Sequence, residues 1–182
     1  MLITNREGEE TIEAMEVSVA DLPSYGFIQA TGRIVKVPSS LDAKSAQQFL
    51  RPFDIVLIVK GSVGKVGIVP HDVPPPGPGG WIAGQSAIVL RVPDDSVVDA
   101  RALAVLLRSA IGQELLNGIV SGASSIKLIQ LRELERLPVL ITDQETNDRA
   151  IHALEKEADL QQAIDRLRQE QSQTAADLWS LN

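Results

Sequence analysis

Side chains and amides that can bind phosphate groups gather at residues 60–65, Lys-Gly-Ser-Val-Gly-Lys. Glycines leave backbone amides accessible in such a turn, and lysines attract phosphate oxygens. Gly64-Lys65 resembles the end of a nucleotide-binding phosphate loop, but Val59 and Val66 stand where that motif requires Gly and Ser or Thr. An apolar, β-branched run also follows the lysine in place of the helix that would face the phosphates. We therefore do not expect a nucleotide site here.

The residues on both sides of this turn indicate a β-hairpin. Residues 55–59 and 66–69 are short runs rich in Val and Ile, bounded by Gly and Pro, as is typical of buried strands. A further strand is predicted at residues 28–37, from which Arg33 and Lys36 point outward. The hairpin would place the lysine-bearing turn at the end of a sheet.

The rest of the chain predicts an α+β fold with short helices. Residues 81–91 form a strand, and apolar residues at spacings of three and four predict one helix over residues 100–116. Residues 121–125 are a small, polar loop, and Lys127 follows it in a short strand. The 182 residues suffice for one well-cored domain with an appended element.

No catalytic or metal-ligating constellation is recognisable in the sequence. The chain has no cysteine, which excludes disulfides, zinc knuckles and thiol catalysis. His71 and His152 have no acid or nucleophile near them in a known motif, and Asp94 with Asp95 is better explained as a helix cap than as a metal site. No glycine-rich cofactor fingerprint is present. We expect no catalytic residue, no metal and no cofactor, and an enzyme with an unrecognised site is the weakest of the hypotheses.

Composition and charge limit the possible partners. Aromatic residues make up only 3% of the chain, which argues against a stacking platform for single-stranded nucleic acid. The net charge is −7, but residues 142–182 hold nine acidic and four basic side chains and thus most of it. The remainder is nearly neutral and can carry a basic face. No apolar run approaches the ~18 residues that span a bilayer, so we expect a cytoplasmic protein without a membrane partner.

A long helix is predicted from Thr142 to about Leu178, because this stretch has neither Gly nor Pro. Thr142 and Glu145 form a capping box at its start. Ala150 and Leu154 mark a first apolar face, which we expect to dock on the domain. A second face, about a third of a turn away, would offer a heptad-like stripe to another helix; its residues are Leu160, Ile164, Leu167, Gln171 and Leu178. The alternative is that the helix curls along its own domain. The predicted division is 1–141 and 142–182.

The order of these motifs resembles target recognition domains in the specificity (S) subunits of type I restriction–modification systems. Residues 54–69 are similar to the Asp, apolar run and Gly-x-x-Gly-Lys hairpin of that family. Residues 82–90 and 100–116 resemble its next strand and helix, and residues 143–154 resemble the start of its long helix. The chain departs from the family at Phe53, where Gly is usual, and at Leu140-Ile141, where a Pro-rich approach is usual.

The resemblance implies a mixed-sheet recognition domain with a coiled-coil-like spacer helix, which reads double-stranded DNA sequence-specifically. The chain would be a specificity subunit or its half, or the C-terminal recognition part of an adenine DNA methyltransferase. Two copies would form a homodimer through antiparallel helices, and a methyltransferase (M) subunit would perform the methylation. The alternative is a non-catalytic dimerisation or scaffold module with the same fold. The candidate DNA contacts are Arg33, Lys36, Lys60, Ser62, Lys65, Gln85, Ser124, Ser125 and Lys127.

Overall fold

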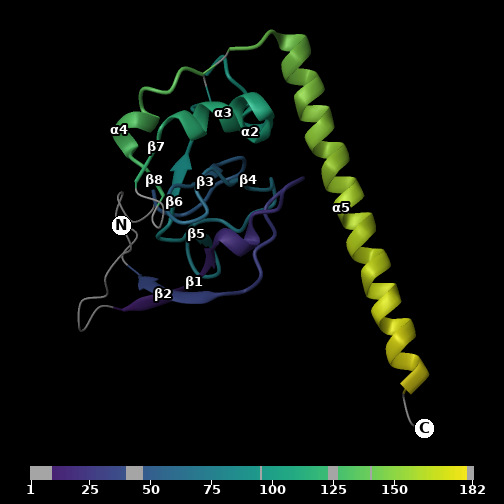
Figure 1. Cartoon of the computed structure of the whole chain (residues 1–182). Coiled ribbons are helices and arrows are strands. Elements are labelled where there is room, and N and C mark those ends of the chain that lie inside the picture. Colours follow the sequence, from purple (N-terminus) through teal and green to yellow (C-terminus); the bar gives the residue numbers. More distant parts are fainter. Residues whose placement is uncertain (1–9, 40–46, 95, 123–126, 140, 180–182) are drawn as a thin grey trace.

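The computed structural model describes residues 10–39, 47–94, 96–122, 127–139 and 141–179, with side chains as far as Thr174. The residues up to Val139, called the body below, contain small sheets and short helices. A long helix extends past the body (Figure 1). The helices are η1 (Val19–Asp21), α2 (Ala100–Arg108), α3 (Ala110–Gly118), α4 (Leu131–Leu134) and the long α5 (Gln144–Trp179).

The strands of the described residues form three sheets, one of which is mixed. The strands are β1 (Thr11–Val17), β2 (Ile34–Pro38), β3 (Ile55–Ile58), β4 (Val66–Ile68), β5 (Trp81–Ala83), β6 (Ala87–Leu90), β7 (Val120–Ser121) and β8 (Leu128–Ile129). The first sheet has the order β2-β1-β5, antiparallel and then parallel; β4-β3-β6 and β7-β8 are antiparallel. The predicted α+β class with a mixed sheet and a long C-terminal helix is confirmed. In Figure 1, α2, α3 and α4 lie on one side of the β4-β3-β6 sheet, and β1 and β2 lie on its opposite side.

The strand β3 is buried on both faces, and each of its four residues is at most 1% exposed. Ile55 and Leu57 pack against side chains of α2, α3 and α5. Val56 and Ile58 belong to a second cluster, which includes residues of β1 and of the segment after it. Because both faces are covered, the strand is a continuous apolar run instead of alternating with polar residues. This burial fixes the hairpin that the sequence predicts.

The single helix predicted for residues 100–116 is wrong in its middle, because the chain forms two helices there. The hydroxyl of Ser109 donates to the Leu106 carbonyl oxygen at 2.6 Å and accepts the amide of Gly112 at 3.2 Å. Ser109 thus ends α2 and caps α3. A Cβ on Gly112 would lie 2.1 Å from the Leu106 carbonyl oxygen, so this corner requires glycine.

The strand predicted for residues 28–37 is also shorter than expected, since β2 begins only at Ile34. Ile28 instead donates its amide to the Ile68 carbonyl on β4 at 2.9 Å. The amide and hydroxyl of Thr31 both donate to Asp21, which is only 4% exposed. A buried carboxylate therefore holds this segment as a loop and prevents it from extending β2.

The helix α5 begins one residue later than the predicted capping box implies. The Asp143 carboxylate accepts the amide of Thr146 at 2.8 Å and is the cap, in place of Thr142. Hydrogen bonds from the side chain and then the amide of Thr146 lower the pKa of Asp143, as expected for a carboxylate at a helix N-terminus. Although α5 has 36 residues, neither it nor another helix in the described part of the chain is apolar enough to cross a membrane.

The first half of α5 docks on the body through the buried side chain of Leu154 and through a close backbone approach. Leu154 is fully buried in the cluster that contains β3. Gly26 donates its amide to the Glu157 carboxylate at 3.1 Å and accepts Arg108 Nη1 at 2.8 Å through its carbonyl. A Cβ on Gly26 would lie 3.3 Å from the Cα of Ala158, so the backbones of the Gly26 loop and of α5 are in close contact.

Candidate nucleic-acid interface

The turn between β3 and β4 projects from the end of the buried hairpin. Gly64 donates its amide to the Ile58 carbonyl at 2.9 Å and closes the turn. Gly61 and Gly64 have φ values of 82° and 87°, in the left-handed region that glycine adopts without a Cβ penalty. Lys60 and Ser62 are exposed on this turn. The strand β4 follows, as the sequence predicts.

A second basic side chain is brought to this turn by backbone pairing. Lys60 and Leu128 form an isolated antiparallel bridge, and Gly61 donates its amide to the Lys127 carbonyl at 3.4 Å. The backbones of Lys60 and Lys127 therefore lie side by side, and both residues are exposed. Two positive charges at one end of a sheet create a local attraction for phosphate despite the negative net charge.

The turn between β5 and β6 lies on the other side of the hairpin end. Val59 donates its amide to the Ser86 carbonyl at 2.8 Å, while its own carbonyl accepts the amide of Ile129 at 2.9 Å. Val59 thus connects both neighbouring segments to the hairpin. Gln85 precedes Ser86 and is exposed. Its amide group can donate and accept hydrogen bonds at base edges, as adenine recognition requires.

Arg33 reaches the same region across a hollow of about 370 Å³, which Gln85 also lines. Its Nε lies 3.0 Å from the carboxylate of Glu16, and the two side chains are 70% and 7% exposed respectively. The nearly buried carboxylate orients the guanidinium, while most of the arginine remains in solvent. The guanidinium of Arg33 has further donors that can bind a phosphate, but the negative charge of Glu16 offsets the positive charge of Arg33.

Lys65 and Lys36 are placed differently from the other candidates. Lys65 Nζ donates to the Val19 carbonyl on η1 at 2.8 Å and is half-buried, so it braces the turn from inside. Lys36 lies on β2 opposite Glu13 of β1. The candidate residues Ser124 and Ser125 lie outside the described residues.

Three contributors to this region were missed from the sequence. Glu16 is the partner of Arg33, Ser86 holds the β5–β6 turn against the hairpin, and Gln113 on α3 donates to the Gly64 carbonyl at 3.0 Å. Glu16 alternates with apolar residues in β1, a pattern that indicates an exposed side chain, and no local pattern identifies the other two. In the part of the chain that the structure describes, no three His, Asp or Glu side chains are grouped so as to hold a metal ion.

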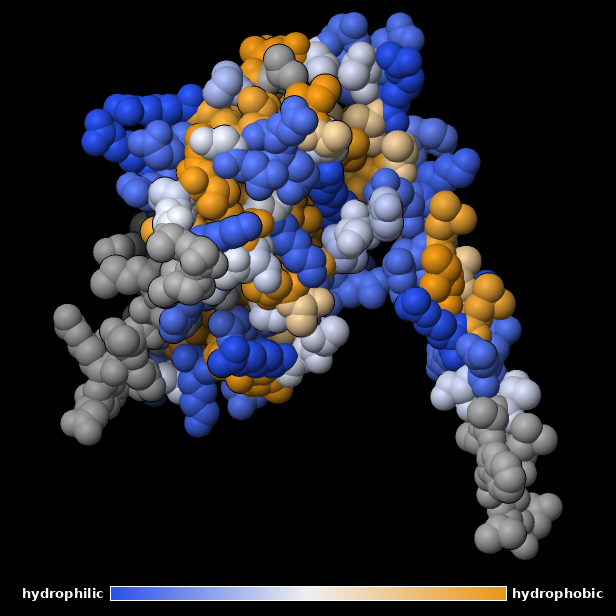
Figure 2. Space-filling view, viewed as in Figure 1, coloured by the Kyte–Doolittle hydropathy of each residue, from blue (hydrophilic) through white to orange (hydrophobic). Residues whose placement is uncertain are grey.

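The outer half of α5 presents large apolar side chains to solvent. Leu160, Ile164 and Leu167 are 55%, 43% and 63% exposed. Figure 2 shows hydrophobic side chains on the part of α5 that extends away from the body. Gln171 is exposed as well, whereas the side chain of Leu178 lies outside the described residues. Leu160, Ile164 and Leu167 are together called the α5 stripe below.

The whole arrangement is similar to solved structures of type I restriction–modification systems. A chain from a study of the complex assembly and conformational transition of such a system matches 98% of this chain and 39% of its own length, with 18% identity and a TM-score of 0.51. The S subunit of a type I restriction–modification system from M. genitalium matches 82% of this chain and 40% of its own length, with 18% identity and a TM-score of 0.44. No family model and no curated protein matches the sequence.

This chain thus spans about two fifths of the length of these proteins. The similarity extends from the sheets through α5, since 98% of the chain is covered in the first comparison. The chain has the fold of a type I restriction–modification system subunit, which confirms at the level of the fold the resemblance to specificity subunits predicted from the sequence.

Proposed function

We propose that the chain is a sequence-specific, double-stranded DNA recognition module of a type I restriction–modification system, equivalent to half of a specificity subunit. The observation that carries this proposal is the fold shared over 98% of the chain with a protein of which it spans 39%. One recognition body followed by one long helix accounts for such a ratio. Residues 1–141 read DNA in this proposal, and residues 142–182 serve as spacer.

The hairpin end supplies the contacts to DNA. Lys60 and Lys127, with backbones side by side, bind phosphates and position the body, and Arg33 adds a third contact across the hollow. Gln85 and Ser62 have the donor and acceptor groups that read base edges.

The α5 stripe pairs two copies of the chain. Burying Leu160, Ile164 and Leu167 against a second helix removes large apolar side chains from water. At 1.5 Å per residue, a 36-residue helix is about 54 Å long, and an antiparallel pair holds two bodies apart on one duplex. A symmetric pair reads a two-part, inverted-repeat site. The chain itself performs no reaction and uses no cofactor; a partner methyltransferase subunit methylates adenine, and the complex works in the cytoplasm.

A DNA-binding assay of the chain with its methyltransferase partner tests the proposal. We expect binding to random duplex pools to enrich one two-part sequence and to weaken steeply as salt rises, because phosphate contacts release counterions. The charge-reversing variants Lys60→Glu and Lys127→Glu weaken this binding, whereas Lys156→Glu, a matched change at an exposed residue outside the candidate contacts, has little effect. No preference for any duplex at low salt, alone or with the partner, would refute the proposal.

A scaffold module is the second candidate, and the net charge of −7 favours it. In that case an acidic surface binds protein and the hairpin end has no DNA partner. The double variant Lys60→Glu, Lys127→Glu changes two exposed side chains and discriminates between the two. Unchanged partner binding without a DNA phenotype supports the scaffold, and loss of DNA binding supports the recognition module.

A further inference from the structure

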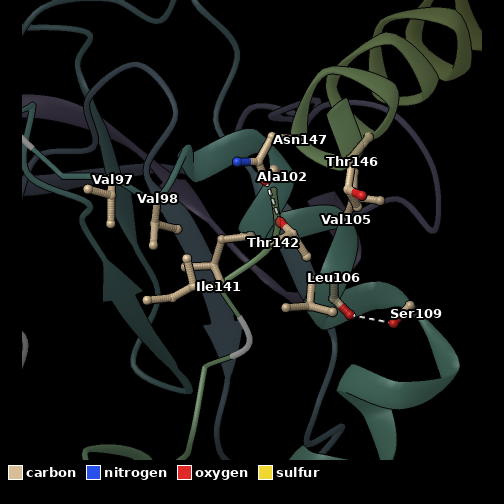
Figure 3. A pocket seen from close by; sticks show the side chains of 12 residues that line it. Val97, Val98, Ala102, Val105, Leu106, Ser109, Ile141, Thr142, Thr146 and Asn147 are labelled. Atoms are coloured by element: carbon tan, nitrogen blue, oxygen red, sulfur yellow. Dashed lines mark hydrogen bonds between the residues drawn. The ribbon is translucent and has the colours of Figure 1, made fainter. Parts of the chain in front are cut away.

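An apolar pocket of about 200 Å³ opens where α2 meets the start of α5 (Figure 3). Its lining includes Val97 and Val98 before α2, Leu106 on α2, and Ile141 before α5. In Figure 3, the side chains of Val98, Ile141 and Leu106 surround the same space. Val97 is 79% exposed and Ile141 is 71% exposed, so the structure leaves large apolar side chains in water here. Such a surface is typical of a binding site for another apolar group.

The pocket and the α5 stripe lie along one line of positions on the helix. Ala150 lines the pocket, and Ala153 follows it three residues later on the exposed side of α5. Steps of three and four residues lead from Ala153 through Glu157 to Leu160, the first residue of the stripe. A helix that lies on the stripe and runs toward the start of α5 therefore ends at the pocket.

We propose that this pocket receives the last turn of α5, at Leu178, from a second copy of the chain. The inference rests on the proposed pairing of two chains through the α5 stripe, of which Ile164 is the central residue. Leu178 follows Ile164 by 14 residues, and Ala150 precedes it by 14 residues. A two-fold axis at Ile164 therefore places Leu178 of the second copy beside Ala150. Both spans are about 21 Å at 1.5 Å per residue.

Charge favours the antiparallel direction that this seating requires. With the axis at Ile164, Arg168 of one copy lies within one residue of the position opposite Asp159 of the other. Both side chains are exposed on α5. A parallel pair would instead set Glu157 and Asp159 against the same residues of the second copy, where like charges repel. It would also leave the last turn about 42 Å from the pocket, because 28 residues separate Ala150 from Leu178.

Engineered disulfides test the seating directly, because the chain has no cysteine. The double variant Ala150→Cys, Leu178→Cys of the full chain should form a covalent dimer on mild oxidation, seen on a non-reducing gel. Each single variant should remain uncrosslinked, because an antiparallel pair separates the two copies of either position by about 42 Å. Ile164→Cys should crosslink by itself, because it lies at the axis, and therefore reports the pairing independently of the pocket.

The outcomes separate the pocket from the pairing. Crosslinking of Ile164→Cys without crosslinking of the double variant overturns the seating and leaves the proposed pairing intact. A covalent dimer of Leu178→Cys alone shows a parallel pair and also overturns it. Failure of Ile164→Cys to crosslink refutes the pairing, and the seating with it.

A surface variant gives a second measurement that needs no crosslink. Ile141→Asp places a charge in the pocket at a side chain that is 71% exposed, so the fold of the monomer should be unaffected. We expect it to raise the dimer dissociation constant about tenfold or more, as measured by sedimentation. Val139→Asp is the matched control, since Val139 is 46% exposed and does not line the pocket. Equal dissociation constants for the two variants would contradict the inference.

Discussion

The guanidinium of Arg101 on α2 lies over the ring of Phe53, with 5.2 Å between Cζ and the ring centroid. Phe53 has a φ of 64°, in the left-handed region that a residue with a Cβ rarely adopts. Specificity subunits, which the chain resembles, usually have glycine here. The next residue, Asp54, is buried and pairs with Arg91 at 2.6 Å. We infer that ring contacts to Arg101 and to His71, whose ring centroid is 5.8 Å away, offset the strain that positions Asp54.

Replacing Phe53 tests this compensation. Both Phe53→Ala and Phe53→Gly remove the ring and should destabilise the fold, but only the alanine keeps the strained Cβ. We expect the glycine variant to be more stable than the alanine variant by about 0.5–1 kcal/mol, because relief of about 1–2 kcal/mol is partly offset by the extra entropy of unfolded glycine. Urea unfolding measures the difference. An alanine variant more stable than the glycine variant would show that the backbone is unstrained.

The contact between Gly26 and α5 can be separated from backbone strain with a matched pair. Gly26 and Gly32 have φ values of 69° and 99°, so alanine is strained at both. Only at Gly26 would the new Cβ meet the backbone of α5, whereas at Gly32 it would meet nothing within 4 Å. Gly26→Ala should therefore cost about 1 kcal/mol more than Gly32→Ala. It should also raise amide exchange in the first half of α5. Equal stability losses and unchanged exchange would contradict the prediction.

The hairpin and the long helix could be predicted because local pattern and tertiary environment agree in both. The Val- and Ile-rich runs on either side of the glycine turn form the buried strands β3 and β4. The second apolar face of α5 is exposed, as expected for a face that does not dock on the body. The break at Ser109 was missed because residues 100–116 keep helical spacing across it. Only the packing of Gly112 against α2 shows that the chain must change direction between α2 and α3.

The spatial arrangement of the candidate site could not be predicted from the sequence. Lys60 and Lys127 are far apart in sequence, and an isolated β-bridge with flanking backbone hydrogen bonds brings their segments together. Sequence patterns also cannot show that Lys65 points inward, because its hydrogen-bond partner is the backbone carbonyl of Val19. Backbone acceptors have no residue-specific signature, so side chains that bond to them are indistinguishable in sequence from exposed ones.

The two lysines of the turn should therefore behave differently when each is changed to methionine. Lys65→Met removes a charged donor from the Val19 carbonyl and should reduce the unfolding free energy by about 1 kcal/mol. Lys60→Met should leave stability unchanged and should reduce the slope of log affinity for DNA against log salt by about 0.9, as expected for one phosphate contact. Thermal unfolding and salt titrations measure the two effects. Equal stability losses would show that the contact of Lys65 contributes nothing.

Asp21 makes the stability of the body depend on pH. Its carboxylate is 4% exposed, and burial alone would raise its pKa, but hydrogen bonds from Thr31 and Ser18 together outweigh burial and lower the pKa below the ordinary 3.8. A carboxyl group with a lowered folded-state pKa stabilises the fold fully above its unfolded value and loses this contribution as pH falls through the folded value. Stability from Asp21 is thus present at neutral pH and lost below about 3.8.

The variant Asp21→Asn isolates this contribution, because asparagine has the same size and cannot ionise. Its amide group can accept from Thr31 but would turn a donor toward the amide of Ser18, which now donates to Asp21 at 2.7 Å. At pH 7 the variant should be less stable than the parent by about 1–3 kcal/mol, the cost of an unmatched buried polar group. Urea unfolding between pH 7 and 2 should show this gap narrowing below pH 3.8, as the parent carboxylate becomes protonated. A gap that stays constant to pH 2 would mean that the Asp21 carboxyl does not titrate differently in the folded and unfolded chains, and that its hydrogen bonds act through shape alone.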